Sequence, residues 1–337
     1  MNKPLLLFLL LTSILFSCEK KTTESHVTYM VSTLAGSEKG YADGIGSEAR
    51  FDDIQGMTVD KAGNIFIADI NNNAIRKITP DGLVSTFAGG TYGNANGIGT
   101  AAQFSGPSDI EMDKNGDFYV VEGYGNRIRK ITESGEVTNF AGSLVSESGY
   151  VNAQGDESRF YVPVGIAIVP DGNIYVTEIT GRIRKITPSG LVSTLAGNGT
   201  IGAEDGIGEM ATFDSPYGID ADLSGNLFVV ETVGNKLRKI TPDGIVTTMF
   251  PGFTQPNDVA VDKQGNCFVA NTVSRTVNKV TSDKKVSIAF GSTIEGQTDG
   301  PGDAASFKRI TGIHFDQTGK IIYVSDNNRI RKIQIVE

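Results

Sequence analysis

Six copies of one four-strand unit predict that this chain folds as an all-β, six-bladed β-propeller. The run VSTLAG, in close variants, begins at Val31, Val84, Val137, Val192, Val246 and Val286. Between successive copies lie three further short strands, rich in β-branched and aromatic residues and bounded by turn residues. No helical period of useful length separates them, so we expect four antiparallel strands in every blade.

The first unit shows each expected element in chain order. The first strand is GMTVD (56–60), the second NIFIAD (64–69), the third AIRKIT (74–79) and the fourth VSTFAG (84–89). The connecting turns KAGN and TPDG place glycine where the backbone needs a positive φ. The other units repeat this order, which predicts one sheet for each unit.

The two ends of the chain predict how the ring closes. The last unit stops at Glu337 after three strands, whereas the N-terminal VSTLAG has no first three strands before it. Pairing the two segments removes two exposed sheet edges. We therefore expect Met30–Gly36 to form the outer strand of the last blade.

The N-terminus has the pattern of an export signal. An apolar run from Leu5 to Phe16 is too short to span a bilayer as a helix, and the residues LFSC that end at Cys18 resemble the lipobox of bacterial lipoproteins. We predict a signal peptide at 1–17, a lipidated tether at 18–29 and a propeller at 30–337. The alternative is plain secretion with an incidental cysteine. The expected location is the bacterial cell envelope, at the outer membrane.

Composition narrows the range of partners. The net charge of −9 argues against nucleic acid and against anionic membrane surfaces, so contact with a membrane is expected only through the lipid. The chain has no tryptophan, which excludes sugar platforms built from that residue. Cys267 lies in the apolar pattern NCFVA and is expected to be a buried, inert thiol.

Two of the units resemble NHL repeats. The segments VDKAGNIFIADINNNAIRKITPDG (59–82) and ADLSGNLFVVETVGNKLRKITPDG (221–244) carry the resemblance, which extends over residues 31–337 and is weakest in the fifth unit. Such propellers include scaffolds, RNA- and protein-binding domains and a few enzymes. The resemblance therefore implies the fold far more firmly than the function.

Residues that recur in every blade are expected to be structural. An acid ends the second strand and an Arg lies in the third strand of five units, and both are replaced by Asn in the fifth. We predict a structural ion pair; the alternative is an acidic ring that binds cations. The long loops repeat an Asp/Asn-Gly turn and a Phe, which should form a small satellite core. Asp43, Asp205 and Asp299 fit turn chemistry better than calcium binding.

The fifth unit lacks the long loop, which predicts a notch on one face of the ring. Its expected ligand-binding residues are Phe253, Gln255, Asn257 and Asp258 on the floor, and Tyr217, Lys308 and Arg309 on the walls. A concavity with aromatic and polar groups is a default ligand-site hypothesis. The alternative is neutral loss of the loop.

A column of first-strand residues suggests a second candidate site. Its members in blades 1 to 6 are Thr58, Glu111, Ala167, Asp220, Ala260 and His314. The Glu, Asp and His fall on alternate blades, and such side chains could hold Zn²⁺, Mn²⁺ or Fe²⁺, with Ca²⁺ less suited. The alternative is a set of polar side chains satisfied by channel water.

Known NHL-like enzymes limit what the resemblance implies. The peptidyl-amidating lyase holds zinc through several histidines, but this chain has only His26 and His314. Streptogramin-type lyases need a catalytic His, and gluconolactonase-type enzymes use acidic and amide ligands. We therefore expect a non-catalytic module without a cofactor that binds an envelope protein, a peptide or a glycan. The alternative is a metal-dependent hydrolase or lyase that uses Glu111, Asp220 and His314.

Overall fold

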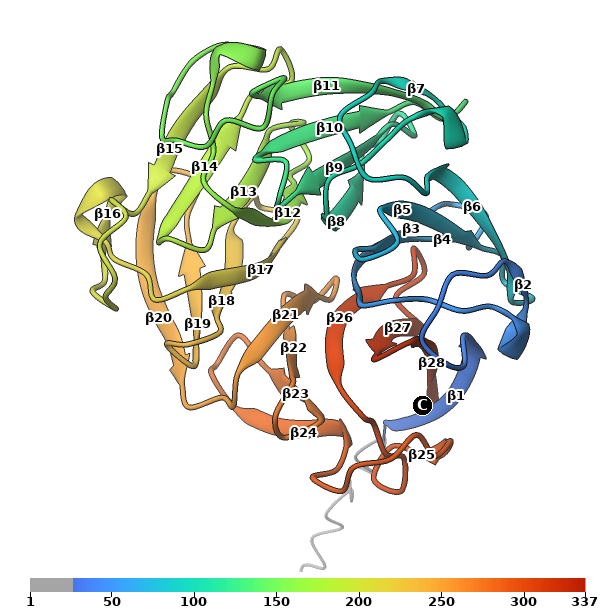
Figure 1. Cartoon of the computed structure of the whole chain (residues 1–337). Coiled ribbons are helices and arrows are strands. Elements are labelled where there is room, and N and C mark those ends of the chain that lie inside the picture. Colours follow the sequence, from blue (N-terminus) through green and yellow to red (C-terminus); the bar gives the residue numbers. More distant parts are fainter. Residues whose placement is uncertain (1–26, 337) are drawn as a thin grey trace, which may run out of the picture.

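The computed structural model describes residues 27–336 and shows six antiparallel sheets arranged in a ring (Figure 1). The innermost strands of neighbouring sheets touch one another, and the last sheet touches the first. The predicted six-bladed β-propeller is therefore confirmed. The expected signal segment 1–17, Cys18 and most of the tether lie outside the described residues.

Each blade is built from four main strands, which follow one another along the chain from the innermost outward. Blade 1 comprises β3 (Ile54–Val59), β4 (Ile65–Asp69), β5 (Ala74–Ile78) and β6 (Leu83–Gly89). Blade 2 comprises β8 (Pro107–Met112), β9 (Phe118–Glu122), β10 (Arg127–Ile131) and β11 (Glu136–Gly142). Blade 3 comprises β12 (Pro163–Ile168), β13 (Ile174–Glu178), β14 (Arg182–Ile186) and β15 (Val192–Ala196).

The second half of the ring is built in the same way, except that the outer strand of blade 6 comes from the N-terminus. Blade 4 comprises β17 (Pro216–Ala221), β18 (Leu227–Glu231), β19 (Lys236–Ile240) and β20 (Ile245–Pro251). Blade 5 comprises β21 (Pro256–Val261), β22 (Cys267–Asn271), β23 (Thr276–Val280) and β24 (Val286–Gly291). Blade 6 comprises β26 (Ile310–Phe315), β27 (Ile321–Asp326), β28 (Arg329–Val336) and β1 (Thr28–Ala35).

The long loops add a short fifth strand to the outer edge of four blades. These strands are β2 (Gly44–Ile45) on blade 1, β7 (Gly97–Ile98) on blade 2, β16 (Gly206–Ile207) on blade 4 and β25 (Gly300–Pro301) on blade 6. Single-turn 3-10 helices occur in four loops: η1 (Gly46–Glu48), η2 (Gly99–Ala101), η3 (Gly155–Glu157) and η4 (Gly208–Met210). None of the helices within residues 27–336 is long and apolar enough to cross a membrane.

The ring closes through the two ends of the chain, as the sequence predicts. Strand β1 pairs antiparallel with β28, with Thr28 opposite Val336 and Val31 opposite Ile333. The strand begins at Thr28, two residues before the expected boundary. The register places Val31 in the core, where 3% of its surface is exposed. The N-terminal strand thus completes blade 6 (Figure 1).

The apolar core lies between neighbouring blades. Strand β4 is buried along its whole length because both of its faces are covered. The loop phenylalanines are fully buried, as expected, but they do not form separate satellite cores. Phe51, which comes from the loop before blade 1, packs in one cluster with Ala35 and Ile330 of blade 6. The loops therefore fasten each blade to the preceding one.

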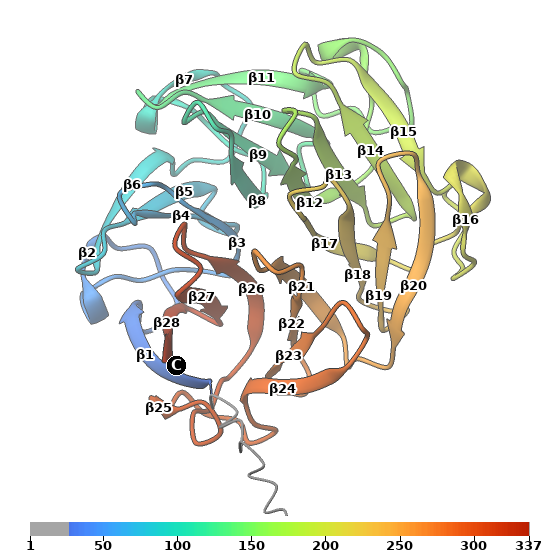
Figure 2. The same ribbon diagram turned by 180° about the vertical axis from the view of Figure 1, so that it is seen from behind.

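The ring has two faces of different character (Figures 1 and 2). One, which we call the loop face, carries the long loops and the beginnings of the innermost strands. The other, the turn face, carries the tight turns between the first and second strands of each blade. In blade 1 this turn is held by Asp60, whose Oδ1 accepts the backbone N–H groups of Ala62 and Asn64.

Candidate functional site

The acid and the Arg that recur in five blades form buried ion pairs within each blade. In blade 1 the Arg76 guanidinium lies 2.9 Å from the Asp69 carboxylate, and neither side chain is exposed. The equivalent pairs are Glu122–Arg129, Glu178–Arg184, Glu231–Arg238 and Asp326–Arg331. The predicted structural ion pair is therefore present, and each pair holds one blade together rather than lining an open ring.

The same Arg also locks the long loop of its own blade. Arg76 donates to the Ala42 carbonyl at 2.8 Å and to the Asp43 carboxylate at 2.6 Å. Asp43 in turn accepts the backbone N–H of Thr86 on the outer strand at 3.2 Å. Asp205 and Asp299 make the equivalent contacts in blades 4 and 6. These contacts account for the three aspartates without a calcium ion.

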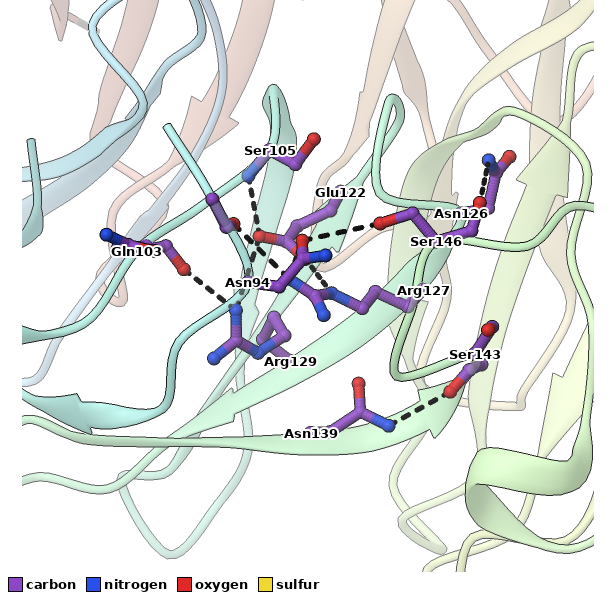
Figure 3. Close-up of polar contacts among 12 residues, drawn as sticks. Asn94, Gln103, Ser105, Glu122, Asn126, Arg127, Arg129, Asn139, Ser143 and Ser146 are labelled. Carbon is purple, nitrogen blue, oxygen red and sulfur yellow. Dashed lines mark hydrogen bonds and ion pairs between the residues drawn. The ribbon is translucent and has the colours of Figure 1, made fainter. Parts of the chain in front are cut away.

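Blade 2 extends this network with a second Arg (Figure 3). Glu122 binds both Arg127 and Arg129, and Arg127 also donates to Asn94 at 2.9 Å. Burial lowers the pKa of Arg129 to about 10, although the charge of Glu122 opposes that shift. These side chains bind other parts of the fold, so we interpret the cluster as structural.

Blade 5 lacks the ion pair because it lacks the loop that the Arg would lock. In place of the acid and the Arg, Asn271 donates to Asn278 at 2.9 Å. The connection from β20 to β21 spans only residues 252–255. An Arg at position 278 would have no loop carbonyl or aspartate to bind, and a buried charge without partners is costly.

Three of the residues expected to form the notch at blade 5, Tyr217, Asn257 and Asp258, line one small cavity, whereas the others do not line it. Phe253 is 7% exposed and packs in the core of blade 5, with its ring centroid 5.0 Å from that of Phe250. Asn257 is buried, and its amide donates to the Thr311 carbonyl at 2.6 Å. Gln255 is exposed at the rim. Phe253 is thus a core residue, Asn257 connects two blades and Gln255 is exposed, while the fourth floor residue, Asp258, lines the channel end.

Of the expected wall residues, Tyr217 lies beside Asn257 and Asp258, whereas Arg309 points to the loop before blade 1. The hydroxyl of Tyr217 in blade 4 donates to Gln55 Oε1 in blade 1 at 2.8 Å, across the channel end. Arg309 is exposed and pairs with Asp53 at 2.8 Å. Tyr217, Asn257 and Asp258 line a cavity of only about 10 Å³ at this end. That volume holds about one water molecule.

Two channel carboxylates, Asp109 and Asp258, follow a sequence pattern of their own, and Asp109 was not among the predicted site residues. The first position of the GMTVD-like strand is Gly in blades 1, 3, 4 and 6 but Asp in blades 2 and 5. A Cβ atom on Gly56 would lie 1.7 Å from Asp109 Oδ1, and one on Gly218 would lie 2.4 Å from Asp258 Oδ1. Each glycine thus makes room for the aspartate of the next blade.

These aspartates connect neighbouring blades. Asp109 Oδ2 accepts the backbone N–H of Ile166 at 2.9 Å, and Asp258 Oδ2 accepts that of Ile313 at 2.9 Å. Burial raises the pKa of both carboxyls, to about 7 for Asp258, and the charge of Asp258 raises that of Asp109 further. Each aspartate therefore links its own blade to the next blade in the ring.

Glu111, Asp220 and His314 line one narrow part of the channel, as their shared column position predicts. The cavity there is about 10 Å³. Burial, reinforced by the charge of Asp220, raises the pKa of Glu111 to about 8. Burial also raises the pKa of Asp220 to about 7 and lowers that of His314 to about 4.

Both carboxylates of this group already have partners. Glu111 Oε1 accepts the Thr58 hydroxyl at 3.1 Å, and Asp220 Oδ2 accepts the Val261 N–H of the next blade at 2.7 Å. Within residues 27–336, no three or more His, Cys, Asp and Glu side chains are arranged to hold a metal ion. The metal site therefore stays a prediction without geometric support. The expectation for Cys267 is met, because the thiol is free and buried.

A wide hollow lies on the turn face, where the sequence did not indicate a site. This cavity, of about 590 Å³, lies under blades 2, 3 and 4 and reaches Gln317 of blade 6. Its apolar wall consists of Met112, Ile168, Val169, Pro170, Pro188, Ala221 and Leu223. Its polar groups include Lys114, Asn115 and three turn aspartates. We call it the turn-face pocket.

The turn aspartates of this pocket are committed to their own turns. Asp113 Oδ1 accepts the N–H groups of Asn115 and Asp117, and Asp222 Oδ1 accepts those of Ser224 and Asn226. Lys114 and Leu223 are exposed instead, Leu223 to 79%. The pocket thus offers an apolar wall with a few polar groups at its rim.

Comparison with known proteins finds relatives that contain NHL repeats. No family model matches the chain. NHL repeat-containing protein 2 from Bos taurus is 25% identical over 247 residues, which cover 62% of this chain and 34% of that protein. Peptidyl-alpha-hydroxyglycine alpha-amidating lyase 1 from Drosophila melanogaster is 32% identical over 117 residues, which cover 34% of this chain and 21% of the lyase. The chain is an NHL-type β-propeller.

Only part of each relative is matched. Protein SUPPRESSOR OF QUENCHING 1, chloroplastic, from Arabidopsis thaliana is 30% identical over 172 residues, which cover 48% of this chain and 16% of that protein. The NHL-type propeller therefore spans about a third or less of the length of these relatives.

Solved structures share the fold at low sequence identity. An auxiliary nutrient binding protein from Bacteroides ovatus has a TM-score of 0.68 and 18% identity, with 92% of this propeller and 77% of that chain covered. The virginiamycin B lyase of Staphylococcus aureus has a TM-score of 0.58 and 19% identity, with 92% and 100% covered. At such identities the NHL-type propeller shares the architecture of these proteins, and no function follows from it.

Proposed function

We propose that this NHL-type propeller is an exported, lipid-anchored binding module that holds a short peptide in the turn-face pocket. The single observation that carries the binding role is the 590 Å³ hollow, because small-molecule sites typically have volumes of about 300–1,000 Å³. Export and the anchor rest on the N-terminal pattern and on Cys18. The outer membrane of the bacterial envelope is the location that this pattern favours.

The lining of the pocket favours a peptide over a glycan. Its walls are mainly aliphatic, with Ile168, Pro170 and Leu223 among them. The one aromatic side chain, Tyr119, is only 6% exposed and offers no open ring face for a sugar. Asn115 and Lys114 at the rim suit the carbonyl and carboxylate oxygens of a peptide.

A catalytic role in the channel is less favoured by the available space. The fold also occurs in a lyase and in a protein described as a gluconolactonase. Glu111 and Asp220 have raised pKa values that would suit acid–base chemistry. The cavity beside them is about 10 Å³, however, whereas the turn-face pocket is many times larger. A substrate fits the pocket and does not fit beside these carboxyls.

The test is a thermal-shift screen with unmodified tri- and tetrapeptides and, in parallel, mono- and disaccharides. We expect peptides to raise the unfolding temperature of the parent protein. Leu223→Asp should abolish that shift, because it places a charge on the apolar wall. The matched control is Leu144→Asp, since Leu144 is also exposed (54%) but lies in the long loop before blade 3.

Two outcomes would contradict the proposal. A shift produced only by saccharides would replace the peptide with a glycan. A peptide shift that survives in Leu223→Asp would remove the pocket as the binding site.

A further inference from the structure

The outer edge of blade 5 differs from that of every other blade. In blades 1, 2, 4 and 6 a fifth strand from the long loop pairs with the outer strand. In blade 3 a single bridge between Gln154 and Leu191 covers the same edge. Within the part of the chain that the structure describes, strand β24 of blade 5 has neither, because the connection before blade 5 is too short to reach it.

The other blades show which backbone groups such a segment binds. In blade 4 the N–H of Thr248 donates to Asp205 at 3.0 Å, and the N–H of Gly208 donates to the Gly244 carbonyl at 2.9 Å. The equivalent groups in blade 5 are the Ile288 N–H and the Lys284 carbonyl. Within residues 27–336 no loop segment bonds to either of these two groups, unlike their counterparts in blade 4.

The side chains along this edge have changed together with the loop. Ile288 replaces the Thr or Asn of the other blades and is 62% exposed. Lys284 replaces the Gly of the preceding turn and keeps its positive φ of 65°. Asn278 replaces the buried Arg, and its Oδ1 accepts Asn271 and Thr276, so only its N–H groups are left for an incoming acceptor.

We propose that the edge of β24 binds an extended, acidic segment of a partner polypeptide by β-strand addition. The partner segment would take the position that β16 takes on blade 4, with a carboxylate on the Ile288 N–H and an apolar side chain against Ile288. The exposed Lys284 complements an acidic segment, whereas the neighbouring Lys285 pairs with Asp283 at 2.8 Å. This surface lies on the rim and is independent of the turn-face pocket.

A second copy of this chain fits the edge less well. Strand β24 offers only six residues, from Val286 to Gly291, whereas stable interfaces bury about 1,200–2,000 Å² in total. An extended segment needs only the edge itself.

The probe is a fluorescently labelled synthetic peptide with the sequence AEDGIGEMATF, which is the loop segment 203–213 of blade 4. Fluorescence anisotropy with the full chain should show saturable binding. A peptide with Lys in place of its Asp should bind more weakly, because it cannot supply the carboxylate.

The variant that tests the edge is Ile288→Pro, which removes the N–H donor. Its affinity for the peptide should fall at least about tenfold, since a charge-assisted hydrogen bond is lost. The folded state should persist, because edge positions tolerate proline and the equivalent N–H in blade 4 bonds to the loop and not to the sheet. Ile98→Ala, at an exposed isoleucine on the opposite blade, should bind as the parent does.

Each result decides the matter. Saturable binding that is lost in Ile288→Pro and kept in Ile98→Ala supports strand addition. Absence of binding, or equal binding by Ile288→Pro with a parent-like unfolding temperature, overturns it. Concentration-dependent dimers that Ile288→Pro dissociates would make a second copy the occupant and would also overturn the proposal.

Discussion

The buried pair Glu231–Arg238 allows a quantitative test of why blade 5 differs. Both side chains are fully buried and lie 2.6 Å apart. Arg238→Asn leaves the carboxylate without its counter-charge, and breaking a buried pair in this way costs about 3–5 kcal/mol. Glu231→Asn should cost a similar amount, because it leaves a buried guanidinium with fewer acceptors.

The double variant Glu231→Asn/Arg238→Asn reproduces the arrangement found naturally at Asn271 and Asn278. It leaves no buried charge at this pair, so we expect it to cost at least about 2 kcal/mol less than the sum of the two single variants. It still loses the Arg238 bonds to Glu204 and Asp205, so it should not recover the parent stability. Denaturant unfolding of the four proteins measures this coupling.

The pH dependence supplies an independent check. Burial raises the pKa of Glu231, and the charge of Arg238 opposes that shift. Without Arg238 the folded-state pKa rises further above the unfolded value, so the folded state binds the extra proton. Stability of Arg238→Asn should then fall as pH rises from about 5 to about 8. Additive costs, or a pH-independent single variant, would refute the reasoning.

Three further predictions concern the channel, the seam and the anchor. Glu111→Gln should stabilise the protein by up to roughly 5 kcal/mol above about pH 8 and have little effect near pH 4, because the raised pKa of about 8 means that folding disfavours the carboxylate. Urea titrations of the parent and the variant at the two pH values measure this effect. A difference in stability between the two proteins that is the same at both pH values would contradict it. Val31→Asp should destabilise the folded protein by more than about 3 kcal/mol and reduce hydrogen-exchange protection in β28. Ser32→Asp, at the exposed neighbouring position, should change the stability by less than about 0.5 kcal/mol. Equal effects of the two substitutions would argue against a core role for this strand. Cys18→Ala should abolish incorporation of labelled palmitate and release the protein from membranes, and retained label would remove the anchor.

The strands and the seam could be predicted because they depend on local signals. Turn sequences such as KAGN and alternating apolar residues specify strands without reference to the rest of the chain. The pairing of β1 with β28 followed from counting strands at the two ends. The error of two residues at Thr28 arises because the ladder continues past the repeated motif into polar residues.

The candidate sites could be predicted only in part, because they depend on how separate blades meet. The column position of Glu111, Asp220 and His314 correctly placed them together in the channel. A phenylalanine before a strand, however, looks the same in sequence whether it lines a notch or fills a core, and Phe253 does the latter. The turn-face pocket arises from the spacing of turns on different blades, which no single segment encodes.

The seam between β1 and β28 also means that the ring has no privileged starting blade. Thr28 and Val336 are direct neighbours in the ladder, so a short linker between them would make the chain of the propeller continuous at this seam. New ends opened in the turn between the third and fourth strands of another blade would then shift the closing strand to that sheet. Circular permutants of this kind should keep the same architecture, and they would allow the proposed membrane tether to be moved to another sector of the ring.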